Sequence, residues 1–383
     1  MGFLKHKILP LVFILLLAGC ARSVIKYSTK DDENPYRMFG KIPSREFYLP
    51  VTVSDSLALK WESETYGSFP NSSISVYDDL FFVNDLAGRV LCFDIESGKK
   101  IGNVKYSYGC VYSTPVPFRS KIIFPLALDK ENLTEIIIYD YNQGKELDAI
   151  ELPGRVLTQM LVLDDDLLFT SEVGIAYRMN SNGKILWETH TRVPTRSSPA
   201  LVNNLFVFGN DRGEIIALNT DTGDSVYVKN VGGHFFSGLT ISDSVIFAGN
   251  DNGSVYAMSL NNSEIIWQFN THNRIKMEPA IDDQNVFIGN LNGDFFCIDK
   301  FTGTEKWKVH FEGILNSTPL VTENLIILPN VLFAIHLIDK TDGRLLKTVS
   351  LDGRAKLSPV IHKNILFIGF DDGVIRAYDF VDK

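Results

Sequence analysis

Residues 198–227 read SPALVNNLFVFGNDRGEIIALNTDTGDSVY, a succession of short apolar runs separated by turn-forming residues. The runs are rich in β-branched and aromatic types and end at Gly, Asn or Asp, which is the pattern of short β-strands. Gly213 and Gly223 stand where hairpin turns need a positive φ, which glycine adopts without steric cost. The pattern predicts strand, turn, strand, turn and strand, with a further strand before the next copy.

The same pattern recurs along the chain from residue 57 onward, at intervals of about 40 residues. The positions that match Pro199 in the other copies are Ser73, Pro115, Met160, Gly238, Pro279, Pro319 and Pro359. An aromatic residue follows the second turn in phase, as Trp187, Tyr227, Trp267 and Trp307. Eight copies of four short strands predict an all-β fold, an eight-bladed β-propeller of four-stranded antiparallel blades. A stacked solenoid is the alternative, but it would need capping repeats with a polar outer face.

The two ends of the repeat region complement each other. The last copy stops after residues 374–380 without a fourth strand, whereas residues 57–62, LALKWE, form an extra strand before the first copy. Pairing of this strand with the last blade would close the ring and remove two unpaired sheet edges. We therefore expect residues 57–383 to form the propeller, with the ring closed by its N-terminal strand.

A known repeat family shows the same residues in the same places. Residues 293–307 read GDFFCIDKFTGTEKW, and residues 213–223 read GEIIALNTDTG. Both resemble the PQQ-like, or quinoprotein-type, repeat, a resemblance that covers about residues 57–380 and implies that its Trp and Gly dock neighbouring blades. Cys92 and Cys297 stand where other copies have Ala, as in Ala217, so we interpret them as small buried side chains.

The first residues of the chain predict export and lipid attachment. Residues 8–17 are apolar throughout, too short a run to span a bilayer, which needs about 20 apolar residues. The run leads into LAGC at residues 17–20, which resembles the lipobox of bacterial lipoproteins, where the Cys20 thiol carries diacylglycerol. We expect residues 1–19 to be a signal peptide. Ala21 suggests sorting to the outer membrane, facing the periplasm, because lipoproteins retained in the inner membrane commonly have Asp there.

Residues 20–56 are expected to form a lipidated flexible tether. They include KDDENP at residues 30–35, are polar, and show no apolar period, so disorder is the default interpretation. On this interpretation the segment contributes nothing to the stability of the propeller.

Composition and motifs exclude several classes of function. The chain has 37 Lys and Arg against 46 Asp and Glu, a formal net charge of −9, which disfavours non-specific nucleic-acid binding. It shows no nucleophile–base pattern, no metal-like spacing of His or Cys, and no phosphate loop. We therefore predict no catalytic residues, no metal and no cofactor, and expect that the chain is not an enzyme.

Cations recur at matched positions just before the Pro199 position of several copies. These loops lead into the innermost strand of each blade, so they would lie on one face near the central channel and create a local positive field. The candidate residues for binding a partner or an anion are Arg155, Arg192, Arg196, Arg274, Lys276, Arg354 and Lys356. The alternative is a rim of solvated loop charges.

Lipobox, short tether and eight compact repeats together resemble the BamB family, accessory lipoproteins of the outer-membrane β-barrel assembly machinery. The resemblance implies a non-enzymatic periplasmic scaffold that aids folding and insertion of outer-membrane proteins. It would act as a monomer within a hetero-complex, docked on the periplasmic domains of a BamA-like protein. In that family the contact uses an Arg-bearing loop and a pair of Asp in the next loop. Arg192 and Arg196 are candidates for the first, but residues 232–236 contain no Asp.

Two other functions remain open from the sequence. One is a propeller lipoprotein that binds a small anion or a polysaccharide in the channel mouth. The other is a quinone (PQQ)-dependent oxidoreductase, but such enzymes usually carry a vicinal Cys pair and long insertions between blades, which this chain lacks.

Overall fold

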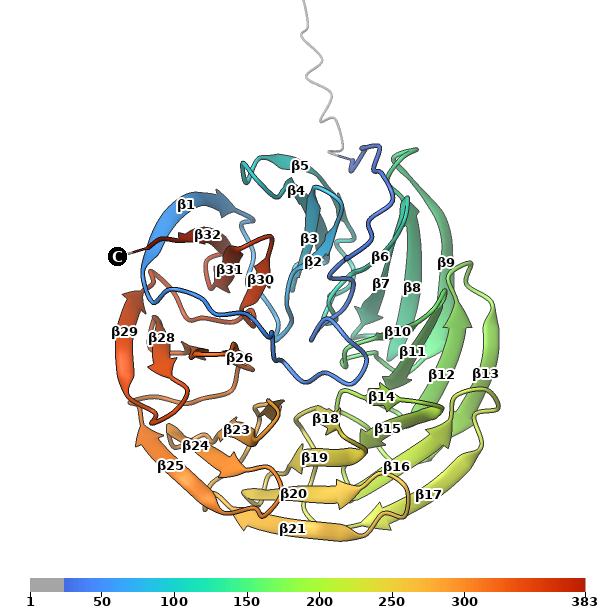
Figure 1. Ribbon diagram of the computed structural model, residues 1–383. Coiled ribbons are helices and arrows are strands. Elements are labelled where there is room, and N and C mark those ends of the chain that lie inside the picture. Colours follow the sequence, from blue (N-terminus) through green and yellow to red (C-terminus); the bar gives the residue numbers. More distant parts are fainter. Residues whose placement is uncertain (1–23, 383) are drawn as a thin grey trace, which may run out of the picture.

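The computed structural model, which describes residues 24–382, is a ring of eight four-stranded antiparallel sheets around a central axis (Figure 1). Seven sheets consist of consecutive strands, and the eighth combines the first strand of the chain with the last three. The described residues form no helix long and apolar enough to cross a membrane. The predicted eight-bladed β-propeller is confirmed.

The strands fall into four concentric sets. The innermost strands are β2 (Ser75–Tyr77), β6 (Val116–Phe118), β10 (Leu161–Leu163), β14 (Ala200–Val202), β18 (Leu239–Ser242), β22 (Ala280–Ile281), β26 (Leu320–Val321) and β30 (Val360–His362). The second strands are β3 (Leu80–Asp85), β7 (Lys121–Leu128), β11 (Asp166–Ser171), β15 (Leu205–Gly209), β19 (Val245–Gly249), β23 (Asn285–Gly289), β27 (Leu325–Asn330) and β31 (Ile365–Phe370). The third strands are β4 (Arg89–Asp94), β8 (Leu133–Asp140), β12 (Ile175–Asn180), β16 (Glu214–Asn219), β20 (Ser254–Ser259), β24 (Asp294–Asp299), β28 (Ala334–Asp339) and β32 (Val374–Phe380). The outermost strands are β5 (Lys100–Lys105), β9 (Lys145–Pro153), β13 (Ile185–His190), β17 (Ser225–Asn230), β21 (Ile265–Asn270), β25 (Glu305–His310), β29 (Leu345–Ser350) and β1 (Leu57–Glu64).

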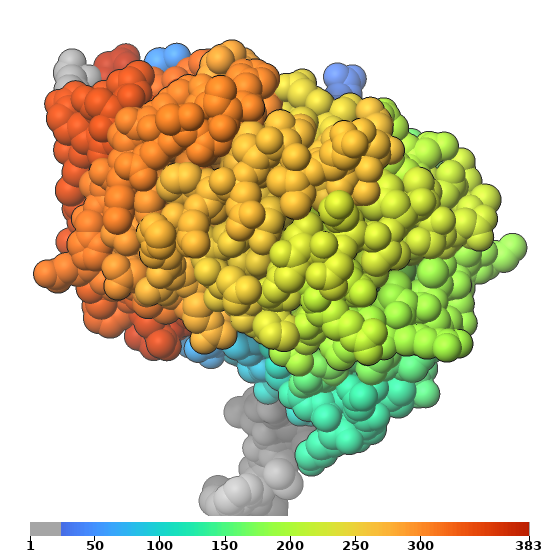
Figure 2. All heavy atoms as spheres, turned by 90° about the horizontal axis from the view of Figure 1, so that it is seen from below, coloured from blue at the N-terminus to red at the C-terminus, as the bar shows by residue number. Residues whose placement is uncertain are grey.

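Burial follows the position of a strand in its blade. The middle strands are buried on both faces because a neighbouring blade packs on each side. Their sequences are therefore continuous apolar runs. In β16, for example, Ile215, Ile216 and Ala217 are all buried. The outermost β17 alternates between exposed and half-buried residues. Seen from the side, the middle blades of the chain, yellow to orange, stand next to one another around the circumference (Figure 2).

The ring is closed as the sequence predicts. Strand β1 pairs antiparallel with β32, with Leu57 opposite Phe380 and Glu64 opposite Val374. Arg376 of β32 strengthens the seam, since its Nε donates to Glu62 Oε2 of β1 at 2.6 Å. The first and last strands of the propeller therefore share one blade.

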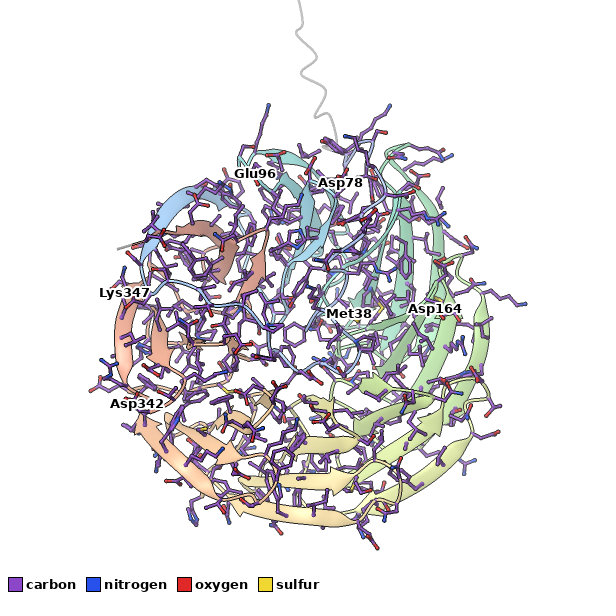
Figure 3. All side chains as sticks on the ribbon, viewed as in Figure 1. Met38, Asp78, Glu96, Asp164, Asp342 and Lys347 are labelled. Atoms are coloured by element: carbon purple, nitrogen blue, oxygen red, sulfur yellow. The ribbon has the colours of Figure 1, made fainter. Side chains whose placement is uncertain are left out.

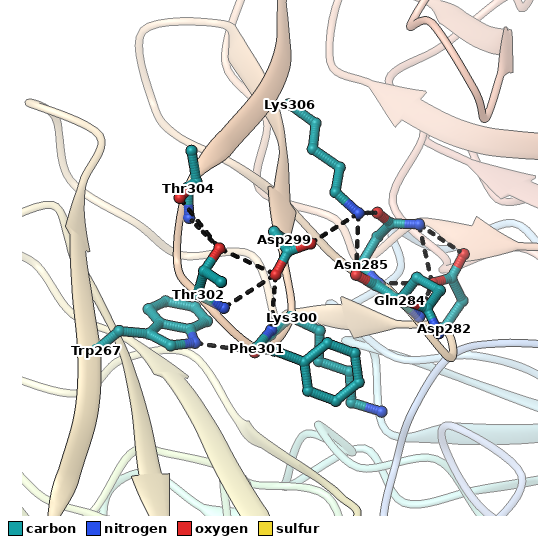
Figure 4. Close-up of polar contacts among 10 residues, drawn as sticks. All are labelled: Trp267, Asp282, Gln284, Asn285, Asp299, Lys300, Phe301, Thr302, Thr304 and Lys306. Atoms are coloured by element: carbon teal, nitrogen blue, oxygen red, sulfur yellow. Dashed lines mark hydrogen bonds and ion pairs between the residues drawn. The ribbon is translucent and has the colours of Figure 1, made fainter.

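The repeated Trp residues dock neighbouring blades, as the repeat family implies. The indole Nε1 of Trp267 donates to the carbonyl oxygen of Lys300 in the next blade at 2.9 Å (Figure 4). A Cβ on Gly303 would come within 2.7 Å of the Trp267 ring, so the indole needs a glycine there. The Asp299 carboxylate stabilises the turn by accepting hydrogen bonds from the backbone N–H and the hydroxyl of Thr302. A hydrogen bond from Lys306 is the main reason that the pKa of Asp299 falls to about 2.

Strand pairing corrects the repeat alignment in two copies. Ala200 pairs with Val207 in β14–β15, and the equivalent pair in β18–β19 is Thr240 with Phe247. The residue that matches Pro199 is therefore Leu239 rather than Gly238. By the same criterion Ser75, which pairs with Phe82, places Ile74 rather than Ser73 at this position. Neither copy has the Pro that marks this position in most of the others, so the sequence alone did not fix the alignment of these two copies.

The segment before the propeller is not the flexible tether that its polarity predicts. Residues 24–56 run over the ring and across its centre (Figure 1), where Met38 lies among side chains of the inner strands (Figure 3). Tyr36, Phe39, Arg45 and Phe47 are all buried. Only residues 20–23 of the predicted tether lie outside the described residues, together with the predicted signal peptide and Cys20.

Backbone hydrogen bonds explain why this segment is ordered. The innermost strands present a free edge to the channel, and the segment pairs with four of them in succession. Leu201, Ile241, Ile281 and Val321 donate their N–H groups to the carbonyl oxygens of Pro43, Ser44, Glu46 and Phe47, at 2.8 to 2.9 Å. Sheet edges that the repeat leaves unpaired thus hold a segment whose own sequence shows no strand pattern.

Candidate functional site

The predicted cations lie at one mouth of the central channel, which we call the basic mouth. It is formed by the loops that connect an outermost strand to the next innermost strand, and it holds Arg155, Arg192, Arg196, Arg274, Lys276, Arg354 and Lys356. The opposite mouth is crossed by residues 24–56, and we call it the closed mouth. The structure divides the seven cations into three groups with different surroundings.

Two of the cations are held by ion pairs to neighbouring turns. Arg155 forms ion pairs with Glu172 and, at 2.8 Å, with Asp129, and the hydrogen bond to Glu172 is the main cause that raises its pKa. Arg354 Nε lies 2.6 Å from Asp371 Oδ2. These two side chains stabilise the loop conformation, so their charge is largely matched before any partner arrives.

Arg192 and Arg274 form a second group. Both are exposed, and neither has an ion-pair partner among residues 24–382. Arg192 also has a positive φ of 60°, which an arginine seldom adopts. Their charges are free to meet an acidic surface.

Arg196, Lys276 and Lys356 form the third group and line a cavity of about 350 Å³ at the channel axis. Phe236 lies between the first two, with its ring centroid 5.7 Å from Arg196 Cζ and 6.0 Å from Lys276 Nζ. Arg196 reaches Asp211 at 3.4 Å, whereas Lys276 and Lys356 have no ion-pair partner among the described residues.

A buried ion pair forms the floor of this cavity. Arg45 Nη2 lies 2.7 Å from Glu278 Oε2, and the two side chains are 0% and 9% exposed. The Arg45 guanidinium also packs against the rings of Phe39 and Phe47 at 4.9 and 5.6 Å. Burial raises the pKa of Glu278 and lowers that of Arg45, and each charge opposes the shift of the other.

Gly238 makes room for this pair. A Cβ at this position would lie 2.3 Å from Glu278 Oε1 and 3.0 Å from Arg45 Nη1. The sequence analysis missed Arg45 and Glu278, because Arg45 belongs to a segment predicted to be disordered. One feature of the sequence pointed to this pair. Residue 238 is a glycine, whereas the equivalent residues Ser198, Glu278 and Ser358 are polar.

The loop after β17 contains no Asp, but an acidic side chain reaches it from a neighbouring turn. The backbone N–H of His234 donates to Asp251 Oδ1 at 2.7 Å, and the His234 ring stacks on Phe236. A carboxylate is therefore present beside the loop, although the pair of Asp that the family resemblance implies is not in it.

The described cysteines are buried or half-buried and unpaired. Cys92 pairs with Phe82 as Ala217 pairs with Val207, which places it at the small-residue position, and Cys297 is equivalent. Burial raises the pKa of the Cys297 thiol to about 12 and that of the Cys92 thiol further. In residues 24–382, Cys92, Cys110 and Cys297 are free, and no three His, Cys, Asp or Glu gather in a group that could hold a metal ion.

Comparison with known proteins identifies the family. The model of the family described as "Outer membrane protein assembly factor BamB" matches residues 126–237 and 251–382, more than half of the chain. The chain belongs to the BamB family. It is 25% identical over 186 residues to "Outer membrane protein assembly factor BamB" of Legionella pneumophila (strain Paris), which covers 46% of each protein. The match thus spans about half the length of this curated relative.

Solved structures share the fold. BamB from Moraxella catarrhalis superposes with a TM-score of 0.71 at 16% identity, over 85% of this chain and 100% of that one. A quinohemoprotein alcohol dehydrogenase from Comamonas testosteroni superposes with a TM-score of 0.76 at 10% identity, over 90% of this chain and 80% of that one. At such identities the likeness concerns the fold alone. The expected relationship to BamB and to PQQ-type repeats is confirmed by the family match.

Proposed function

We propose that this BamB-family chain is a non-enzymatic scaffold in the assembly of outer-membrane proteins. The observation that carries the proposal is the family match over more than half of the chain. In this role it binds the periplasmic domains of a BamA-like protein, as one monomer within a hetero-complex. The match to the curated relative covers only 46% of each protein. The partner is therefore proposed from membership of the family.

The anchor in this proposal is a lipid on Cys20 that holds the protein at the outer membrane on its periplasmic side. Two or more acyl chains on one residue give stable attachment without a membrane span. Cys20→Ser should therefore move the protein from the membrane fraction to the soluble periplasmic fraction with its melting temperature unchanged. A variant that stayed with the membrane would show that another feature anchors it.

For the docking surface we propose the exposed cations of the basic mouth, Arg192 and Arg274. Their charges have no partner among the described residues, whereas Arg155 and Arg354 are already paired. Docking through unpaired exposed cations acts mainly on the association rate and weakens with salt. It also costs little desolvation, because the charges stay at the rim.

Charge reversal tests this docking surface. Arg192→Glu combined with Arg274→Glu should slow association with the purified periplasmic domains of a BamA-like protein at least tenfold at low salt, and the remaining binding should depend less on salt. The matched control is Lys99→Glu with Lys184→Glu, because these exposed cations lie in the second-turn hairpins, away from the basic mouth. Equal losses from both pairs would indicate a diffuse field, and no loss from either would remove this surface from the proposal.

A further inference from the structure

The cavity at the basic mouth is a pocket with a floor rather than an open channel. The backbone of residues 36–49 hydrogen-bonds to the backbone of five of the innermost strands, and Phe39 of this segment lines the cavity at its inner end. The buried pair of Arg45 and Glu278 fills the axis at the same level. A molecule that enters from the basic mouth therefore meets a fixed floor.

The rim of this pocket carries more positive charge than the protein neutralises. Arg196, Lys276 and Lys356 come from three different blades and face one cavity. Asp211 offsets part of the Arg196 charge at 3.4 Å, and the only acidic side chain that lines the cavity among residues 24–382, Glu278, is paired with Arg45, so Lys276 and Lys356 are left unmatched. Three like charges around a concave site repel one another, and a concave low-dielectric wall strengthens their field. The chain as a whole has a formal net charge of −9, but the electrostatic potential at this rim is positive and favours binding of an anion.

The inner wall offers polar groups that the protein leaves unused. The hydroxyls of Thr318 and Ser358 line the cavity at residues that are 4% and 6% exposed, and neither has a hydrogen-bond partner among residues 24–382. Asn316, which also lines the cavity, stands at the rim, at the repeat position of Lys276 and Lys356. These two hydroxyls open into the cavity, and polar groups that converge on a cavity without partners in the protein are the features that orient a bound polar molecule.

We propose that this pocket binds a small phosphorylated sugar. A phosphate carries about two negative charges and several acceptor oxygens, which match the fork of Arg196 and the two ammonium groups at the rim. Sugar hydroxyls both donate and accept, so they satisfy the hydroxyls of Thr318 and Ser358 deeper in the pocket. A volume of about 350 Å³ lies at the small end of ligand sites and suits one sugar ring. The inference does not depend on the proposed role in outer-membrane protein assembly.

Titration calorimetry on the full chain tests this site with glucose 6-phosphate and glucose 1-phosphate as probes. At least one of them should bind, and more than tenfold more tightly than either inorganic phosphate or glucose alone. Vesicles of phosphatidylglycerol should bind no better than inorganic phosphate, because a membrane-held phosphate cannot place a sugar ring inside the pocket. Absence of binding by both hexose phosphates, or binding equal to that of inorganic phosphate, would overturn the proposal.

Variants separate the pocket from the docking surface. Lys276→Gln with Lys356→Gln should weaken hexose-phosphate binding at least tenfold, whereas Arg192→Gln with Arg274→Gln, at the same mouth but outside the cavity, should leave it unchanged. Thr318→Val should weaken it with little change in melting temperature, because its hydroxyl has no partner in the protein. Equal loss in the two charge pairs would show a diffuse field instead of a pocket, and loss in neither would show that the cations do not hold the phosphate.

Discussion

The two mouths of the channel are built from the same repeat but end in opposite states. At the closed mouth, residues 24–56 occupy the free edges of the inner strands and bury Arg45 against Glu278. At the basic mouth, Lys276 and Lys356 face a cavity without partners among the described residues. The repeat alone does not distinguish the two faces. The difference comes from residues 24–56, which lie outside the repeat. They cover the closed mouth and leave the basic mouth open to a ligand or a partner.

The largest test of this comparison removes the apolar anchors of the closed mouth. Phe39→Ser with Phe47→Ser deletes two buried rings, and each truncation of a buried Phe typically costs about 3–5 kcal/mol. We expect a fall in the urea midpoint large enough to leave the domain marginally stable. A variant that lacks residues 24–50 should be at least as destabilised, since it also exposes the inner strand edges.

The matched control for this test changes exposed apolar residues of the same segment. Ile42 and Val51 are 42% and 38% exposed, so Ile42→Ser with Val51→Ser should shift the free energy of unfolding by less than about 0.5 kcal/mol each. If the two pairs of variants unfold alike, the segment is a flexible tether after all and both mouths are open.

A somewhat smaller effect is expected from the ion pair on the channel axis. Arg45→Met leaves the Glu278 carboxylate buried without its partner, which should cost about 3–5 kcal/mol at neutral pH. The loss should shrink at acidic pH, because burial raises the pKa of Glu278 and protonation removes the stranded charge. Urea denaturation between pH 7.5 and 4.5 measures both effects.

The double variant Arg45→Met with Glu278→Met should recover most of that stability, since it replaces the pair by apolar side chains of similar length. A single variant as stable as the wild type would show that the pair contributes nothing to closing the channel. A double variant no better than the single would assign the loss to packing instead of charge.

The smallest of the three effects compares two buried histidines, His336 in the third strand of its blade and His362 at the closed mouth. Burial lowers the pKa of His336 to about 4, so above that pH the side chain is neutral in the folded protein. Between about pH 6.5, where histidine in an unfolded chain protonates, and pH 4, only the unfolded chain binds this proton. Stability should therefore fall as the pH falls through this window, by up to about 3 kcal/mol.

Melting temperature against pH at constant ionic strength checks this prediction. His336→Gln should flatten the profile most. His362→Gln, at the closed mouth, should flatten it less, since burial lowers its pKa by a smaller amount. A profile that neither His336→Gln nor His362→Gln changes would contradict the assignment.

The fold could be predicted from the sequence because the same pattern of strands and turns recurs eight times. The extra strand of residues 57–62 predicted closure for the same reason, since it matched a gap in the last copy. The floor of the channel was not accessible, because Arg45 and Phe47 are isolated in a polar segment and their partners are backbone edges that no side-chain pattern reveals. The positions of the cations were predictable, but their pairing was not. Arg155 is neutralised by Glu172 and Arg354 by Asp371, while the residue equivalent to these acids near Arg274 is Leu291.

The closed seam sets the order in which the domain can be completed. Glu62 of β1 and Arg376 of β32 are 314 positions apart, so β1 has no partner until β32 has been synthesised. Hairpins within a blade form from neighbouring residues and need not wait, whereas contacts between distant residues slow folding because a long loop must close first. Until that moment Trp61 and the edge of β1 are exposed to any other unpaired strand. Closure of the ring therefore leaves the growing chain with an unpaired strand edge for a long interval, which ends only when β32 is available.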